Sequence, residues 1–82
     1  MFDYKGRVAV VTGAGSPGGI GFAIAKALAE AGAKLCITST TSRIFDRAAE
    51  LGCMGHIADL TLPDQVAGLF GAVETRLGPV GI

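Results

Sequence analysis

Residues 8–21 read VAVVTGAGSPGGIG, in which an apolar run rich in β-branched side chains stops at a cluster of five glycines. Immediately after the glycines, the periodicity changes from that of a strand to that of a helix. Apolar residues recur there at helical spacing, at Ile20, Ala23, Ile24, Ala27, Leu28 and Ala31. The pattern predicts a strand over residues 7–12 that ends at Thr12 or Gly13, and then an exposed glycine turn. It also predicts a helix over residues 19–31 that begins between Gly18 and Gly21 and is ended by Gly32.

A strand, a glycine turn and a helix in this order are typical of a dinucleotide-binding βαβ unit. A side chain on such a turn would hold the backbone away from a pyrophosphate. The N-terminus of the following helix offers free N–H groups to the anion. The stretch therefore predicts a dinucleotide site, and its candidate residues are Gly13, Gly15, Ser16, Gly19, Ile20 and Gly21.

Beyond residue 32 the chain continues to alternate between strand and helix patterns. Apolar runs predict strands over residues 34–38 and 53–58, and the start of a fourth strand over 80–82. Between them we expect a hydroxyl-rich loop over 39–42, a helix over 43–51 ended by Gly52, and a third helix with Thr61 as its N-cap and Gly78 at its end. The second helix is expected to turn Ile44, Phe45, Ala48 and Leu51 inward, and Arg43, Asp46, Arg47 and Glu50 outward. The third is expected to bury Val66, Leu69, Phe70, Val73 and Leu77.

This alternation predicts an α/β fold, a Rossmann-type doubly wound parallel sheet with right-handed crossovers. Only its first half, βαβαβα with strand order 3-2-1, fits in 82 residues, since a complete two-lobed dinucleotide fold takes roughly 150. We therefore expect residues 1–82 to be the N-terminal part of one incomplete dinucleotide-binding domain. Alone, such a chain is expected to be marginally stable and to self-associate through its first strand.

Composition argues against several classes of function. The formal net charge is zero and aromatic residues make up only 6% of the chain, with no Trp, so neither nucleic acid nor an anionic membrane is expected as a partner. No apolar run approaches the ~20 residues of a membrane span, and residues 1–7 lack the apolar core of a signal peptide, which predicts a cytoplasmic location. Cys36, Cys53 and His56 have no metal-type spacing, so no metal site is predicted.

Four segments carry a more specific resemblance. They read KGRVAVVTG at 5–13, GIGFAIA at 19–25 with LAEAGA at 28–33, ADLT at 58–61, and LGPV at 77–80. Together they resemble the N-terminal portion of the short-chain dehydrogenase/reductase family, in particular members similar to 3-oxoacyl-ACP reductase. The resemblance implies that Asp59, with Leu60 beside it, contacts the adenine of a nicotinamide dinucleotide.

Two glycine registers are possible in the turn. The general fingerprint would use Gly13, Gly15 and Gly18, but it places Phe22 where a small residue is expected. The resemblance implies instead Gly13 followed by Gly19-Ile20-Gly21, which we favour. In that register Ala23, Ala25, Leu28 and Gly32 fall where the helix must pack on the sheet. The turn is two residues longer than the family's usual one, similar in length to that of the enoyl reductase branch. This difference bears on the pyrophosphate contacts around Ser16 and Pro17.

The end of the second strand predicts the choice of cofactor. A carboxylate there would bind the adenosine 2′-hydroxyl and repel a 2′-phosphate. That position falls on Ser39, followed by Thr40 and Arg43, and no carboxylate occurs before Asp46. Hydroxyls with a guanidinium favour NADP over NAD. The alternative is that these hydroxyls cap the second helix and that Arg43 is a solvated charge.

The resemblance implies hydride transfer between the nicotinamide and a small-molecule carbonyl or alcohol substrate, in a parent protein that forms homo-oligomers. The Tyr, Lys, Ser and Asn residues that the family uses for this reaction have no counterparts in these residues, since the only tyrosine, Tyr4, precedes the first strand. We therefore assign no catalytic residue and expect the 82-residue chain alone to be inactive. One alternative is a stand-alone, non-catalytic nucleotide-binding module. Another is an S-adenosylmethionine-dependent methyltransferase, against which the lack of a carboxylate at Ser39 weighs.

Overall fold

The computed structural model describes residues 5–16 and 18–82, so the expectations for Tyr4 and Pro17 lie outside the described residues. Within these ranges the strands are β1 (Val8–Thr12), β2 (Lys34–Ser39) and β3 (Met54–Ile57). They alternate with the helices α1 (Ile20–Glu30), α2 (Arg43–Leu51) and α3 (Pro63–Arg76). The strands are parallel and ordered β1-β2-β3, which is the expected order 3-2-1 counted from the opposite edge. The α/β fold, as the first half of a Rossmann-type sheet, is confirmed.

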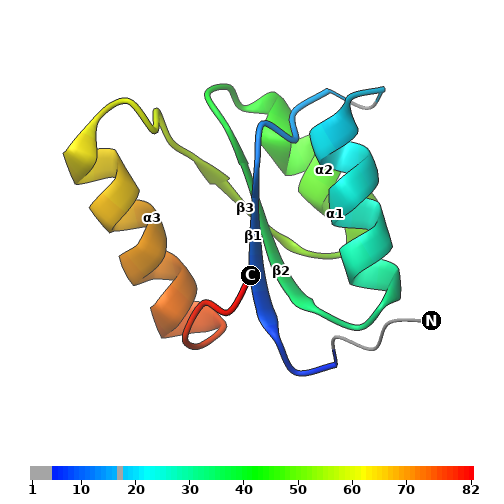
Figure 1. Cartoon of the computed structure of the whole chain (residues 1–82). Helices are drawn as coiled ribbons and strands as arrows, with labels where there is room; N and C mark the ends of the chain where they lie inside the picture. The colour runs from blue at the N-terminus through cyan, green and yellow to red at the C-terminus, as the bar shows by residue number, and fades with distance from the viewer. Residues whose placement is uncertain (1–4, 17) are drawn as a thin grey trace.

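The sheet is covered on both faces. Figure 1 shows α1 and α2 on one side of it and α3 on the other. Leu35 and Ile37 of the central strand β2 pack beneath α1 and α2, whereas Cys36 packs in the cluster beneath α3. A central parallel strand buried on both faces needs continuous apolar character, and this is the pattern that residues 34–38 carry.

The bounds of α1 agree with the prediction. β1 ends at Thr12 and α1 begins at Ile20. Ala31 caps the end of the helix, and Gly32 follows it at φ +94°, a conformation in which glycine avoids the strain of a side chain.

The face that α1 turns toward the sheet agrees in part with the one that the favoured glycine register implies, at Ala25 and Leu28. Ala25 is fully buried, and Leu28 and Ala29 pack against the same cluster. Ile20 is 81% exposed and Ile24 is 49% exposed. Ala23, which the favoured register places on the sheet, is exposed as well. The helix is apolar on two sides, so periodicity does not choose between them, and the side with smaller residues lies against the sheet.

The bounds of α2 are those predicted, with Gly52 in the left-handed conformation after it, but two side chains were assigned wrongly. Phe45, expected inside, is 50% exposed. Arg47, expected outside, has a side chain only 14% exposed and pairs with Glu50 at 2.6 Å. Its guanidinium lies 5.9 Å from the ring centre of Phe22 in α1. Because α2 lies beside α1, one flank of its polar face is covered by its neighbour.

The start of α3 also corrects the sequence analysis. Leu62, in an extended conformation, is the N-cap, and Pro63 opens the helix. Thr61 does not cap the helix, because its hydroxyl bonds to Asp59 instead. Of the predicted apolar face, Leu69 and Val73 are buried, whereas Phe70 is 39% exposed.

The last residues of the chain lie along the free edge of β1 (Figure 1). Val80 forms a parallel bridge with Val8, and the amides of Gly81 and Ile82 donate to the Val8 carbonyl at 2.9 and 3.1 Å. The amide of Val10 donates to the Ile82 carbonyl at 3.0 Å. The expected fourth strand is thus present as an isolated bridge, and it occupies part of the edge expected to be vacant. No described helix is both long enough and apolar enough to span a membrane.

Candidate functional site

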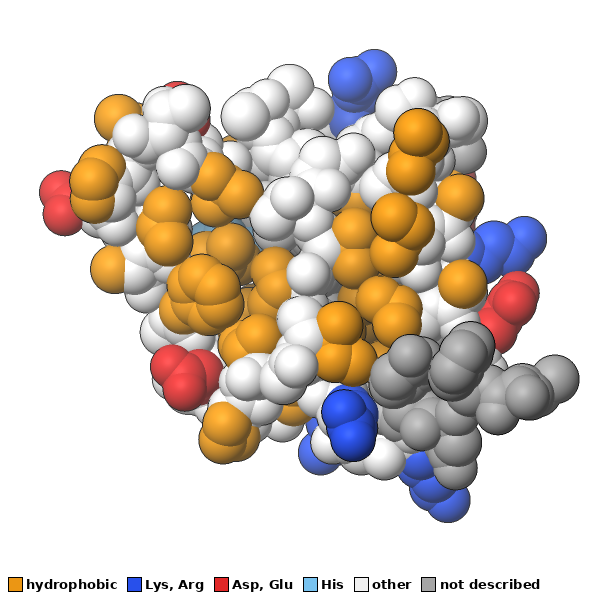
Figure 2. Space-filling model, viewed as in Figure 1, with side chains coloured by type: hydrophobic (Ala, Val, Ile, Leu, Met, Phe, Trp, Pro, Cys, Tyr) orange, Lys and Arg blue, Asp and Glu red, His pale blue; other side chains and the backbone are white. Residues whose placement is uncertain are grey.

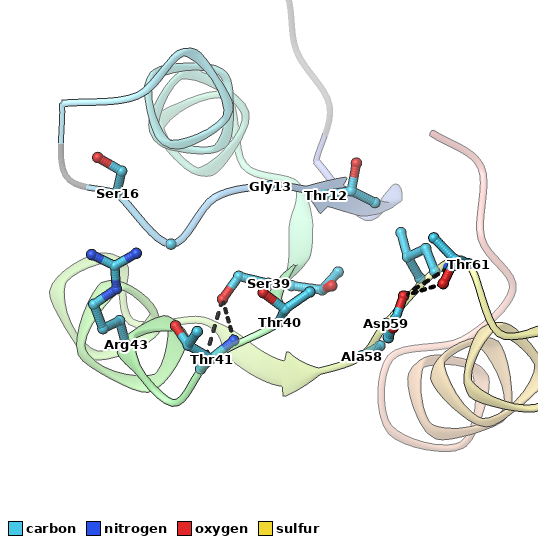
Figure 3. A pocket seen from close by; sticks show the side chains of 13 residues that line it. Thr12, Gly13, Ser16, Ser39, Thr40, Thr41, Arg43, Ala58, Asp59 and Thr61 are labelled. Atoms are coloured by element: carbon cyan, nitrogen blue, oxygen red, sulfur yellow. Dashed lines mark hydrogen bonds between the residues drawn. The ribbon is translucent and has the colours of Figure 1, made fainter.

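A cavity of about 470 Å³ opens where the carboxyl ends of the strands meet. Open parallel sheets bind their ligands at this edge. The lining comes from the end of β1 with the glycine turn, the end of β2 with the loop after it, and the residues that follow β3. In that order, the lining residues are Thr12, Gly13, Gly15, Ser16, Thr38, Ser39, Thr40, Thr41, Arg43, Ala58, Asp59, Leu60 and Thr61. Figure 3 shows Ser16 and Arg43 at one end of the cavity and Asp59 with Thr61 at the other.

The glycine turn bends across the end of β2. Gly13 has φ +67°, and the amide of buried Ala14 donates to the Thr38 carbonyl at 3.1 Å. A β-carbon on Gly15 would lie 2.9 Å from the Ser39 Oγ. The expectation of an exposed turn is therefore wrong for Ala14 and Gly15, because the turn is bonded to the neighbouring strand rather than projecting from the sheet.

The start of α1 lies against the end of β1. A β-carbon on Gly21 would lie 2.7 Å from the Gly13 carbonyl oxygen, so only a glycine permits this approach. Gly19 is the N-cap, and its amide donates to the Ser16 carbonyl at 3.1 Å. The first amides of any helix lack partners within it, and they carry the positive end of the helix dipole. This end of α1 has no acidic residue to neutralise that charge.

The loop after β2 is organised by Ser39. Its hydroxyl donates to the Thr41 carbonyl at 3.1 Å and lies 3.4 Å from the Thr41 amide, which donates to it. The hydroxyl therefore serves the loop itself. Thr40, Thr41 and Arg43 are exposed along the same wall of the cavity. Ser42 precedes α2 without a side-chain capping bond, which does not favour the helix-capping alternative for that residue.

Asp59 is held by bonds on both its side chain and its backbone. Its Oδ1 accepts a hydrogen bond from the Thr61 hydroxyl at 2.6 Å and another from the Thr61 amide at 3.0 Å. These two bonds lower the pKa of the Asp59 carboxyl, the hydroxyl having the larger effect. The backbone amide of Asp59 donates to Gln65 Oε1 in the first turn of α3, at 2.6 Å. The carboxylate is therefore a charged acceptor with a fixed position at its end of the cavity.

Most of the sequence-predicted site residues come together in this cavity. The ones that line it are Gly13, Gly15, Ser16, Ser39, Thr40, Arg43, Asp59 and Leu60. The others, Gly19, Ile20 and Gly21, lie at the start of α1 and outside the lining. Sequence reasoning missed Thr12, Thr38, Thr41, Ala58 and Thr61. Their common signal is position, since each is one of the last two residues of a strand or follows a strand at the carboxyl edge of the sheet.

The lining carries groups that can bind a polar or charged ligand. Its described residues offer hydroxyls, backbone amides, one guanidinium and one carboxylate. Among the described residues no group of His, Cys, Asp and Glu could hold a metal ion. The Cys36 thiol is buried beneath α3, and burial raises its pKa to about 11, which favours the protonated thiol at neutral pH.

Comparisons with known proteins agree with this architecture. The family described as short chain dehydrogenase matches residues 7–82. An uncharacterised oxidoreductase of Mycobacterium tuberculosis is 41% identical over an alignment of 88 residues, which covers the whole of this chain and 33% of that protein. A 2-dehydro-3-deoxy-D-gluconate 5-dehydrogenase of Formosa agariphila is 33% identical over 89 residues, again the whole of this chain and 33% of that protein. The chain thus spans about a third of the length of these relatives.

A solved structure shares the arrangement of the elements. A metagenomic short-chain oxidoreductase in complex with NADP matches with a TM-score of 0.85 and 31% identity, over 95% of this chain and 37% of that one. The family match extends from the residue before β1 to the last residue of the chain. With the same order of strands and helices in the solved relative, this chain belongs to the short-chain dehydrogenase family.

Proposed function

We propose that this chain binds NADP in the cavity at the carboxyl edge of its sheet, as the cofactor-binding portion of a short-chain oxidoreductase. The observation that carries the proposal is the order of groups along the cavity. A glycine turn lies at one wall, hydroxyls and Arg43 lie along the next, and an ionised Asp59 lies at the far end. The solved relative described as a complex with NADP supports it.

The pyrophosphate fits the glycine turn and the start of α1. No side chain projects from Gly13 or Gly15 in the cavity lining, so a phosphate group can approach the backbone amides of the turn. Ser16, Gly19, Ile20 and Gly21 complete this part of the proposed site. Its positive electrostatic potential comes from the N-terminus of α1.

The loop after β2 is the proposed site of the 2′-phosphate. Arg43 supplies a permanent positive charge, and the exposed Thr40 and Thr41 supply hydroxyls. Ser39, whose own hydroxyl is bonded within the loop, contributes by leaving the position free of a carboxylate. A carboxylate there would repel a phosphate dianion and bind a ribose hydroxyl instead.

Asp59 and Leu60 are the proposed contacts of the adenine, at the end of the cavity opposite Arg43. When bound, the nicotinamide would supply hydride chemistry toward a carbonyl or alcohol substrate. The described residues bind and orient the dinucleotide. We propose no catalytic residue among them. A cytoplasmic location, a homo-oligomeric state and kinship with 3-oxoacyl-ACP reductases remain predictions about the whole protein.

The test is a titration of the protein from the complete reading frame with NADPH and with NADH, followed by nucleotide fluorescence. We expect NADPH to bind at least about tenfold more tightly, since a charged hydrogen bond contributes roughly 1.5–3 kcal/mol. Arg43→Gln should remove most of that preference. The matched control is Arg7→Gln. Arg7 is exposed and precedes β1, at the amino end of the strand and so away from the cavity. Equal or tighter binding of NADH by the unaltered protein contradicts the NADP assignment.

A second measurement distinguishes the oxidoreductase from a binding module. NADPH oxidation is followed with a panel of small carbonyl compounds and the same protein. Oxidation that depends on the carbonyl supports the oxidoreductase. Tight NADPH binding without turnover, in a reading frame that lacks a downstream Tyr-x-x-x-Lys pair, supports the non-catalytic module.

A further inference from the structure

The carboxylate of Asp59 presents two unequal oxygens. Both bonds from Thr61 end on Oδ1, at 2.6 and 3.0 Å. No hydrogen bond from the described residues is found on Oδ2. The side chain lies in the lining of the cavity and is partly exposed there. One oxygen is thus used by the protein, and the other is available to a ligand.

The orientation of this carboxylate depends on the residues around it. The last torsion of an Asp side chain is broad and two-fold, so an Asp without partners presents either oxygen at several angles. The Thr61 hydroxyl selects one of these orientations. Gln65 fixes the backbone from which the side chain starts, because its Oε1 accepts the Asp59 amide at 2.6 Å. The amide of Ala58 donates to the Ser39 carbonyl at 3.0 Å, which joins this segment to β2.

An ionised carboxylate only accepts hydrogen bonds, so Oδ2 recognises a donor. Adenine offers such a donor in its exocyclic amino group. Hypoxanthine, of nearly the same shape, has an oxygen there, which a carboxylate repels, and its nearest donor is the N–H group of the adjacent ring nitrogen. A site built to bond an N–H group rejects an analogue without it far more strongly than an apolar pocket rejects a change of size.

We propose that Thr61 and Gln65 are positioning residues that orient Asp59, so that its free oxygen distinguishes adenine from a base with an oxygen at that position. The inference rests on the proposed binding of NADP, and it adds two residues to the site and a base preference to its specificity. Neither residue needs to touch the nucleotide. Their contribution is that the acceptor is already oriented before the nucleotide binds.

The experiment compares the dissociation constants of NADP and its hypoxanthine analogue, nicotinamide hypoxanthine dinucleotide phosphate, for the protein from the complete reading frame. The measured quantity is the ratio of the two constants. We expect Thr61→Val, which keeps the shape and the backbone amide, to reduce that ratio roughly three- to tenfold, the range for one hydrogen bond. Thr61→Ser restores the hydroxyl and should restore the ratio. Gln65→Met, similar in size but without an acceptor, should reduce it as well.

The matched control is Thr75→Val. Thr75 is an exposed threonine of α3 whose hydroxyl donates to the Gly71 carbonyl at 2.8 Å, outside the cavity lining. In this variant the ratio of the two dissociation constants should stay within about twofold of that of the unaltered protein, a smaller change than the loss of one hydrogen bond causes. Thermal unfolding of each variant separates a lost contact from a lost fold.

Asp59→Asn distinguishes the contact of Asp59 with the base from the positioning of Asp59 by its neighbours. If Asp59→Asn lowers the ratio while Thr61→Val leaves it unchanged, Asp59 contacts the base and the positioning role is overturned. If Gln65→Met alone leaves the ratio unchanged, Gln65 is removed from the proposal. If Asp59→Asn leaves both dissociation constants unchanged, the adenine assignment itself is wrong, and the positioning role is overturned with it.

Discussion

The carbonyl oxygen of Gly13 lies 2.7 Å from the point that a β-carbon on Gly21 would occupy, and the Gly13 carbonyl carbon lies 3.0 Å from that point. Both contacts are with backbone, which cannot rotate away as a flexible side chain can. The approach joins the end of β1 to the start of α1 and so sets the position of the glycine turn between them.

We predict that Gly21→Ala destabilises the protein by roughly 1–3 kcal/mol, the usual cost of overpacking. It should also weaken NADPH binding, because the start of α1 must move. Denaturant unfolding and nucleotide titration measure the two effects. The matched control is Gly68→Ala in α3, where an added β-carbon meets nothing within 4 Å. That change should stabilise the helix by roughly 0.5–1 kcal/mol. A Gly21→Ala protein as stable as the unaltered one would show that α1 does not approach β1 this closely.

Ser39→Asp should move the preference from NADPH toward NADH. The new carboxylate repels the 2′-phosphate and offers an acceptor to the ribose hydroxyl. It also removes the hydroxyl that bonds to Thr41. We expect the ratio of the two dissociation constants to change by about tenfold or more, as is usual for loss of a charged contact. Ser42→Asp adds the same charge outside the cavity lining and should leave the ratio nearly unchanged. If the two variants behave alike, net charge rather than position sets the preference.

The pKa of Asp59 should lie below the ordinary value for an Asp, because the Thr61 hydroxyl and amide bond to its charged form. The unfolded chain lacks these bonds, so this stabilisation is complete above a pH of about 3.9. It is lost as the pH falls through the lowered pKa of the folded state. Titration of the Asp59 carboxyl carbon by NMR measures the effect directly. In Thr61→Val the pKa should rise toward the ordinary value, and an unchanged titration would mean that the hydroxyl is not the main cause.

The raised pKa of Cys36 should make the stability of the protein fall as the pH rises at alkaline pH. Burial, and secondarily the nearby Cys53, raise the pKa of its thiol to about 11 from a usual 9.0. The folded state therefore favours the protonated thiol, and this contribution to stability is complete below about pH 9 and lost as the pH rises toward 11. Denaturant midpoints between pH 8 and 11 should fall less steeply in Cys36→Ala than in the unaltered protein. Equal slopes in the two proteins would assign the alkaline loss to other groups.

The 82-residue chain expressed alone should self-associate and reduce no carbonyl compound. Figure 2 shows hydrophobic side chains over α1 and over α3 on one face of the molecule. Ile20, Ile24 and Phe70 are among the exposed large apolar residues of these helices. Since residues 80–82 already bond to the edge of β1, we expect the helix surfaces to contribute more than that strand. Ile24→Lys should raise the monomer fraction in sedimentation, whereas Ala49→Lys, at an exposed position of α2, should not. If the unaltered chain is monomeric and unfolds cooperatively, this expectation is contradicted.

The elements of the fold were largely predictable because each has a local signal. The bounds of α2 were predicted in full, since the hydroxyl loop precedes it and Gly52, at φ +66°, follows it. The face of α1 was predicted only in part, since Ala25 and Leu28 pack on the sheet as the favoured register implies, whereas Ala23 is exposed. Both of its sides are apolar, and the choice depends on the approach of Gly21 to Gly13, which is a contact between elements.

The residues of the candidate site were also predicted in part. Asp59, Ser39 and Arg43 were predicted from their places after apolar runs and from the family resemblance, and all three line the cavity. The role of Thr61 was predicted wrongly, because a threonine before Pro63 has the pattern of an N-cap. Its hydroxyl has two possible partners, the amides of α3 or the Asp59 carboxylate, and a charged acceptor forms the stronger bond.

The bridge between Val8 and Val80 has a consequence for the order in which the chain folds. It joins positions 72 residues apart, as 80 − 8 gives, whereas β1 and β2 pair across 26, from Val8 to Lys34. Closing a longer loop costs more chain entropy, and contacts of large sequence separation slow folding. The amides of Gly81 and Ile82 should therefore become protected from hydrogen exchange after the sheet has formed and should lose protection before it opens. The last residues thus join a sheet that the earlier βαβ units have already built.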